Sequence, residues 1–249
     1  MRRRAREERL ATETILFVSG MMWAATTLQA LTGFGFMMLS VPFLVLALPA
    51  QVVVPGLILM WLPLGTVQMM EHWRWVNRRA LTYMVLGGVV TLPVGAVILR
   101  QVDPETMQRA IGGVMIGLAV LLQINPGAPF QRERAATIGA GMLSGILATS
   151  TSVSGPPVVL LGLKQRWTAK TFRATLVGYF LLISFCCLPF FWGMDLLNKA
   201  SLELALWGIP GVAVGYITGV RGRRRVRGRR FRWVAVGMVM GGGLVAVVL

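Results

Sequence analysis

The stretch TSTSVSGPP, residues 149–157, interrupts a long apolar run of this sequence. It carries five hydroxyl groups and ends in Gly-Pro-Pro. Proline inside a helix removes a backbone hydrogen bond and clashes with the preceding turn, so one helix is expected to end here and another to begin. The apolar segment that follows, residues 155–163, rises only about 14 Å as a helix, whereas the hydrocarbon core of a bilayer is about 30 Å thick. In a membrane protein, this stretch predicts a helix that is broken at membrane depth.

The composition favours a membrane protein. Of the 249 residues, 55% are hydrophobic and 14% are charged, and the mean hydropathy is +0.69. Soluble domains carry about 25% charged residues, so this chain lies outside their range. A membrane-spanning helix needs about 20 apolar residues, and the length therefore allows about eight to ten segments. We expect an all-α, polytopic transmembrane helical bundle.

A second break lies in the first half of the chain, at Gly-Phe-Gly, residues 33–35. The segment at this break, 34–48, rises about 22 Å and is again too short to span. Its residues 42–48 (PFLVLAL) align without gaps on residues 157–163 (PVVLLGL), and three further apolar segments follow each of them. An odd number of segments in each half inverts one half relative to the other. We therefore predict two inverted repeats with broken helices, a pattern that points to the binding site of a transporter.

The predicted organisation has four parts. They are a basic N-terminal tail, a first transmembrane repeat, a connecting loop and a second transmembrane repeat, at residues 1–12, 13–123, 124–135 and 136–249. The five arginines of the tail favour the cytoplasm, although ten strict crossings place the tail outside.

The positive charge supports the inversion. The net charge is +16, and most of the 25 Lys and Arg residues lie in the tail and in short gaps between apolar runs. By the positive-inside rule, the gaps 71–79, 163–173 and 221–232 are expected in the cytoplasm. Anionic lipid head groups complement such basic loops, so the bilayer is a predicted partner. No basic face is interleaved with a soluble fold, and no nucleic-acid partner is expected.

The nine carboxylates all lie in the tail, in loops or at the ends of apolar segments. Intramembrane carboxylates usually mark cation sites and proton relays, so their absence favours a pathway for anions or neutral solutes. His72 is the only histidine, and the neighbours Cys186 and Cys187 lie in an apolar run. These residues offer neither a metal site nor a nucleophile with its base, so we expect no metal, no cofactor and no enzyme. His72 is predicted to lie in an interfacial aromatic belt or to act as a proton-sensitive gate.

The polar residues at the two breaks are the candidates for substrate binding. Hydroxyls and the first N–H groups of a half-helix can replace the hydration shell of an anion. Alternatively, these hydroxyls bond back to the preceding helical turn. Arg173 opens an apolar segment, where it attracts an anion to the inner mouth or only anchors the helix at the interface. The predicted substrate-binding residues are Gln29, Gly33, Gly35, Ser150, Thr151, Ser152, Ser154, Gly155 and Arg173.

Three motifs carry a resemblance to a known family. GFGF at residues 33–36 with Pro42, SGPPVVL at 154–160 and FRAT at 172–175 resemble the sulfite exporter TauE/SafE family, also known as four-toluene-sulfonate uptake permeases. The resemblance covers about residues 14–249. This sequence departs from many relatives because hydroxyl residues stand before Gly-Pro-Pro where those relatives have glycines.

The resemblance implies a multi-pass permease of the bacterial inner membrane for a small anion, such as sulfite, a sulfonate or a related organic acid. We expect secondary transport by alternating access, in which the halves rock about the two breaks. The alternative is a non-transporting membrane scaffold or assembly protein. The oligomeric state stays open at this point.

Overall fold

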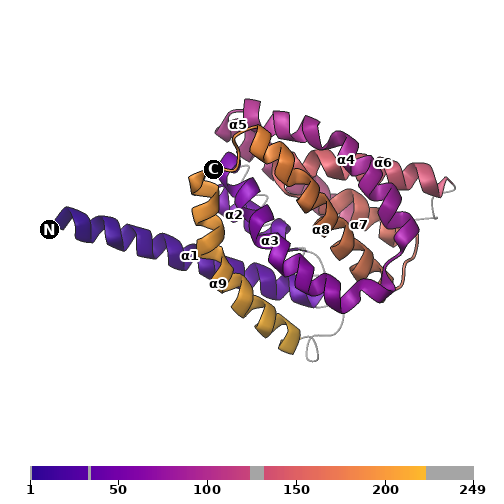
Figure 1. Cartoon of the computed structure of the whole chain (residues 1–249), viewed down its shortest axis with the longest axis horizontal. Coiled ribbons are helices and arrows are strands. Elements are labelled where there is room, and N and C mark those ends of the chain that lie inside the picture. The colour runs from indigo at the N-terminus through magenta and orange to yellow at the C-terminus, as the bar shows by residue number, and fades with distance from the viewer. Residues whose placement is uncertain (1, 33–34, 124–131, 223–249) are drawn as a thin grey trace.

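The computed structural model describes residues 2–32, 35–123 and 132–222, which contain helices and no strand. The helices are α1 (Arg2–Thr32), α2 (Phe36–Leu44), α3 (Ala50–His72), the 3-10 helix η1 (Trp73–Trp75), α4 (Arg78–Gln101), α5 (Pro104–Gln123), α6 (Glu133–Thr151), α7 (Gly155–Lys164), α8 (Ala169–Gly193) and α9 (Lys199–Gly222) (Figure 1). The all-α prediction is confirmed. The basic loop 223–230 and the last apolar segment, 231–249, lie outside the described residues.

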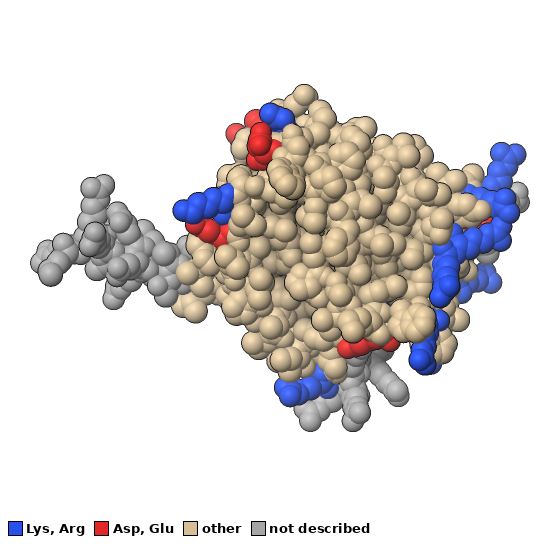
Figure 2. Space-filling view, viewed as in Figure 1, with Lys and Arg blue, Asp and Glu red and all other residues tan. Residues whose placement is uncertain are grey.

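Four of the helical segments are long and apolar enough to cross a membrane. They are α3 together with η1, α4, α8 and α9. Their outward faces carry large apolar side chains, for example Val90 of α4, Trp192 of α8 and Leu206 of α9, each exposed by more than 60%. Figure 2 shows a broad uncharged surface between charged groups at the two ends of the molecule. An apolar surface of this extent suits lipid rather than water, as expected for a multi-pass membrane protein.

Both predicted helix breaks are present. Gly35 separates α1 from α2 with a φ of 122°, and Ser152 ends α6 with a φ of 58°. The half-helices that follow, α2 and α7, have 9 and 10 residues. At 1.5 Å per residue they rise about 15 Å, or half of a bilayer core. The chain after Leu44 continues in irregular turns as far as Pro49, which disfavours helical geometry in the residue before it.

The most extensive helix contacts join the two halves of the chain. They are those of α4 with α6 and of α1 with α9, which we call the two outer pairs. Glycines bring the backbones together in each pair. A Cβ added at Gly141 would lie 2.2 Å from Met84 O, and one at Gly211 would lie 2.0 Å from Ser19 O. Such small-residue contacts allow helices to pack closely in lipid.

The two breaks approach the bundle from opposite ends. Near the first break, Arg173 in the first turns of α8 donates to Leu31 O at 2.8 Å. At the second break, the Ser152 hydroxyl donates to the carbonyl of Val54, in the first turns of α3, at 3.2 Å. The two halves correspond helix by helix, with α1 matching α6, α3 matching α8 and α4 matching α9. Under this correspondence the contact between α8 and the end of α1 matches the contact between α3 and the end of α6, and one outer pair matches the other. This arrangement is the one that two inverted repeats predict.

The end of the bundle where α1 and α3 stop and α8 begins is rich in Lys and Arg. We call it the basic end. It includes Arg74, Arg78 and Lys170, and Asn77 N donates there to Thr175 Oγ1 of α8 at 2.9 Å. Figure 2 shows blue side chains gathered at one end of the molecule. The positive-inside rule predicts that the basic end faces the cytoplasm.

Candidate functional site

A small cavity lies where the two breaks meet. The first break contributes Gln29 and Gly35 to its wall, and the second contributes Ser152, Ser154 and Gly155. The structure therefore brings five of the nine predicted residues, from both halves of the chain, to one place.

Aromatic rings form one wall of the cavity. The ring centroids of Phe36 and Trp61 lie 6.1 Å apart, and those of Trp61 and Phe180 lie 6.3 Å apart with the rings edge to face. Such spacings are favourable for aromatic pairs. Trp61 is only 3% exposed, and its indole nitrogen has no hydrogen-bond partner within the part of the chain that the structure describes. The wall thus offers one buried N–H donor beside an apolar surface.

At the first break, Gln29 caps the half-helix α2. Its Oε1 accepts the backbone N–H of Phe36 at 3.1 Å, and its Nε2 faces Gln68 Oε1 at 3.5 Å. The side chain is 1% exposed. The first N–H groups of a helix have no partner within the helix, so Gln29 supplies the acceptor that α2 needs. Gly35 supplies the φ of 122° that lets the chain turn into α2, which side chains other than glycine rarely adopt.

At the second break, hydroxyls satisfy the backbone. Ser144 donates to Ser154 O at 2.5 Å, and Thr151 Oγ1 accepts the N–H of Val153 at 3.2 Å. Pro156 and Pro157 have no N–H, so the donors of the first turn of α7 that face the break come from the residues around them. A Cβ added at Gly155 would meet only Phe180 Cζ at 3.7 Å and Met38 Sδ at 4.0 Å, which places this glycine against the open cavity.

Three of the other four predicted residues, Ser150, Thr151 and Arg173, are not among the residues that line the cavity. The hydroxyls of Ser150 and Thr151 donate to Ile146 O at 2.7 Å and to Leu147 O at 2.9 Å, as the alternative of bonding back to the preceding turn predicts. Arg173 caps the end of α1 through Leu31 O. Gly33 lies outside the described residues.

Several lining residues were not predicted from the sequence. They are Trp61 on α3 and Phe180, Ser184 and Cys187 on α8. Ser184 is a lone polar residue in a long apolar run, and that signal could have drawn attention to it. The aromatic residues gave no comparable signal, because aromatic side chains are ordinary in apolar helices.

No carboxylate lies among the lining residues of the cavity. The polar groups there are hydroxyls, one carboxamide, an indole N–H and backbone at the ends of two half-helices. Within the described part of the chain, no group of three or more His, Cys, Asp or Glu side chains could hold a metal ion. A cavity with donors and without acidic groups favours an anionic ligand over a cation.

Comparison with known proteins gives one match. Residues 17–246 match the family described as Sulfite exporter TauE/SafE. No curated protein and no solved structure shows a significant match. Because the match covers nearly the whole chain, the protein belongs to the TauE/SafE family, as its motifs indicated. This is a family of membrane transporters rather than of enzymes.

Proposed function

We propose that this TauE/SafE family member carries a small anion across the bacterial inner membrane by alternating access. Sulfite, a sulfonate or a related small organic acid is the proposed substrate. The observation that carries the proposal is that both helix breaks meet in one cavity without a carboxylate.

The chemistry of the cavity supports an anion with a small apolar part. Ser154 and Ser184 bring hydroxyls to it, and the start of α7 brings the positive end of a helix dipole. The wall of Phe36, Trp61 and Phe180 is apolar. The hydroxyl and backbone N–H donors on one side suit the charged group of a sulfonate, and the rings on the other side suit its apolar part. The donors alone suit sulfite.

The helix packing supports alternating access. Each outer pair joins one helix of the first half to one of the second through glycine contacts, so it is expected to move as a unit. The cavity lies between helices of the two pairs, and the breaks are tied to α8 at one end and to α3 at the other. Breaking one of these two hydrogen bonds, Arg173 to Leu31 O or Ser152 to Val54 O, opens one end of the cavity while the other end stays closed. No ATP-binding motif is present in the sequence, so an ion or substrate gradient drives the cycle.

The test is counterflow in proteoliposomes. Vesicles loaded with unlabelled sulfite are diluted into a trace of ³⁵S-sulfite, and the labelled anion accumulates transiently only if a carrier exchanges it. Ethanesulfonate and acetate, added inside in place of sulfite, rank the substrate class. Absence of counterflow with all three anions would overturn the proposal and favour the scaffold alternative.

The matched variants are Gly155→Leu and Gly155→Ala. An alanine Cβ meets only ordinary contacts at this position, whereas a leucine side chain fills the cavity. We expect counterflow to be lost in Gly155→Leu and kept in Gly155→Ala, at equal amounts of inserted protein. Full counterflow in the leucine variant would remove the cavity from the transport path.

A further inference from the structure

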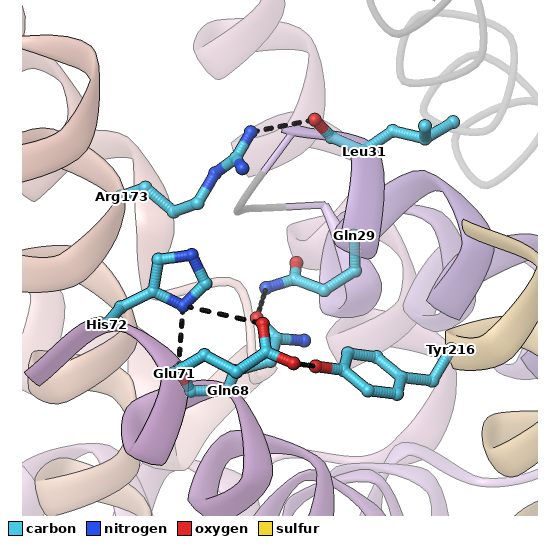
Figure 3. A network of polar contacts seen from close by, with 7 residues as sticks. All are labelled: Gln29, Leu31, Gln68, Glu71, His72, Arg173 and Tyr216. Atoms are coloured by element: carbon cyan, nitrogen blue, oxygen red, sulfur yellow. Dashed lines mark hydrogen bonds and ion pairs between the residues drawn. The ribbon is translucent and has the colours of Figure 1, made fainter. Parts of the chain in front are cut away.

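A polar cluster lies at the basic end, where α1, α3, α8 and α9 meet (Figure 3). The hydroxyl of Tyr216, on α9, donates to the carboxylate of Glu71, on α3. His72 Nδ1 lies 3.9 Å from Glu71 Oε2 and 2.8 Å from the carbonyl oxygen of Gln68. A carbonyl oxygen only accepts hydrogen bonds, so Nδ1 carries the hydrogen and Nε2 is the atom that takes up a proton when the ring becomes charged. Three groups that can exchange protons are thus in contact.

Solvent exposure falls from the outer to the inner residues of the cluster. The Glu71 side chain is 39% exposed, whereas that of His72 is 15% exposed. Inward of both lies Gln68, which is 1% exposed. Glu71 is therefore accessible to protons from solvent, and Gln68 behind it is shielded.

The other charged groups around the cluster are basic. Helix α8 contributes Arg173, which donates a hydrogen bond to Leu31 O. Arg74 lies over the ring of Trp73 at 5.6 Å, and Lys170 lies over the ring of Trp75 at 4.4 Å. Arg78 and Arg79 are exposed at the start of α4. The groups that α1 places in the cluster, Gln29 and the carbonyl of Leu31, are uncharged, and α9 contributes Tyr216 (Figure 3).

Two buried amides connect this cluster to the cavity. Gln68 precedes His72 by one helical turn, and its Oε1 faces Gln29 Nε2 at 3.5 Å. Gln29 in turn lines the cavity and accepts the Phe36 N–H. Gln68 Nε2 is buried without a hydrogen-bond partner in the described residues. A buried donor of this kind costs free energy, so such groups are retained where they serve a function.

We propose that Glu71, with Tyr216 and His72, is the proton-binding site of this transporter, and that Gln68 and Gln29 couple it to the cavity. The inference rests on the proposed transport of an anion and adds its coupling ion. Ionised Glu71 accepts a charge-assisted bond from Tyr216, which ties α3 to the outer pair of α1 and α9. A proton from the cytoplasmic side binds the carboxylate, weakens that bond and removes a negative charge from the path of the anion. When the halves rock and expose the site to the other side, the carboxylate releases the proton there together with the anion, so the two move in the same direction.

Coupling of this kind is reciprocal. If the proton raises the affinity for the anion, the anion raises the affinity for the proton by the same factor. An anion in the cavity competes with Gln29 Oε1 for the Phe36 N–H, which frees the Gln29 amide and disturbs its contact with Gln68. Gln29 and Gln68 are positioning residues in this scheme, because they transmit the state of one site to the other.

The experiment compares two modes of transport in the same proteoliposomes. Counterflow of ³⁵S-sulfite at equal pH on both sides needs no net proton movement, whereas accumulation of ³⁵S-sulfite driven by an imposed pH gradient does. We expect Glu71→Gln to keep counterflow within about twofold and to lose gradient-driven accumulation by about tenfold or more, in the range of typical coupling free energies. Tyr216→Phe, which removes only a hydroxyl, is expected to weaken the accumulation and to shift its pH dependence.

Glu203→Gln is the matched control. Glu203 lies at the start of α9, at the opposite end of that helix from Tyr216, and pairs with Lys199 at 3.7 Å. We expect it to behave like the wild type in both modes. Gradient-driven accumulation that survives in both Glu71→Gln and Tyr216→Phe would overturn the inference while leaving the proposed function intact. Absence of wild-type counterflow with sulfite, ethanesulfonate and acetate would overturn both.

Discussion

Each of the two helix breaks leaves backbone groups at helix ends without a partner in the helix, and different side chains bind these groups at the two breaks. At the first break, a carboxamide caps the start of α2 and a guanidinium from α8 caps the end of α1. At the second break, serine and threonine hydroxyls satisfy the backbone, and most of their partners lie within ten residues. A hydroxyl that bonds to its own helix is fixed when the helix forms. A carboxamide that reaches across a gap can exchange its partner for a solute, so the first break is the adaptable one.

The largest expected effect separates charge from shape at the first break. Gln29→Glu keeps an acceptor for the Phe36 N–H but places a carboxylate beside an anion, and like charges about 4 Å apart repel by about 4 kcal/mol at an effective dielectric constant of about 20. We expect ³⁵S-sulfite counterflow to fall roughly a hundredfold, and Gln29→Leu, which adds no charge, to fall by about tenfold. Similar losses in both variants would mean that Gln29 acts through the fold alone.

The second prediction concerns backbone geometry. Gly35→Ala forces a φ of 122° on a residue with a Cβ, which costs about 1–3 kcal/mol. Ser152→Gly relaxes a left-handed residue and loses one hydroxyl bond, so its two effects partly cancel. We expect the midpoint of thermal unfolding in detergent to fall clearly for Gly35→Ala and little for Ser152→Gly. An equal fall of the unfolding midpoint in both variants would mean that the two breaks do not differ in their need for glycine.

The third prediction tests Arg173 as a cap. Arg173→Gln leaves the carbonyl of Leu31 short of a strong donor, which costs about 1.5 kcal/mol, and Arg173→Lys recovers part of it. The KM of ³⁵S-sulfite uptake, normalised to inserted protein, is expected to stay at the wild-type value in both variants. A raised KM in Arg173→Gln that also depends less on salt would instead assign Arg173 to anion attraction, because exposed charges are screened over about 8 Å at physiological ionic strength.

The smallest expected effect lies within the second break. Ser150→Ala removes only a bond to the preceding turn of α6, and we expect a change in the free energy of unfolding within about 0.5 kcal/mol. Thr151→Ala also leaves the Val153 N–H without its acceptor and is expected to cost about 1 kcal/mol. Ser152→Ala removes the bond to Val54 O on another helix and is expected to cost about 1 kcal/mol. Chemical denaturation in detergent, followed by tryptophan fluorescence, measures all three. A larger loss in Ser150→Ala than in Ser152→Ala would contradict this ranking.

The positions of the breaks could be predicted from the sequence because glycine and proline act on the backbone locally. The prolines at 156 and 157 cannot continue a helix that comes before them, and in the structure they form the first turn of α7. The gap-free match of residues 42–48 to 157–163 supported a second break in the first half. The destination of the hydroxyls could not be predicted. Ser150 and Ser152 are two residues apart and chemically identical, yet one bonds to its own helix and the other to α3.

The cluster at the basic end shows a second reason why sequence reasoning falls short. Glu71 and Tyr216 are 145 residues apart, and nothing in either segment indicates the other. In a bilayer, helices are apolar on all sides, so the periodicity that reveals the buried face of a soluble helix is weak. Glycines were the remaining signal for close packing, and they did not identify which helices they join.

The pairing of α1 with α9 and of α4 with α6 has a consequence for how the protein is made. Of the described helices, α1 leaves the ribosome before all the others and α9 after them. Until α9 arrives, the carbonyls of α1 against which Gly211, Gly215 and Gly219 later pack have no protein neighbour there. Lipid or an insertion factor must keep α1 in its transmembrane orientation during that time. Neither repeat can complete its own packing, and a ribosome that stops between the repeats leaves a product that quality-control proteases can recognise.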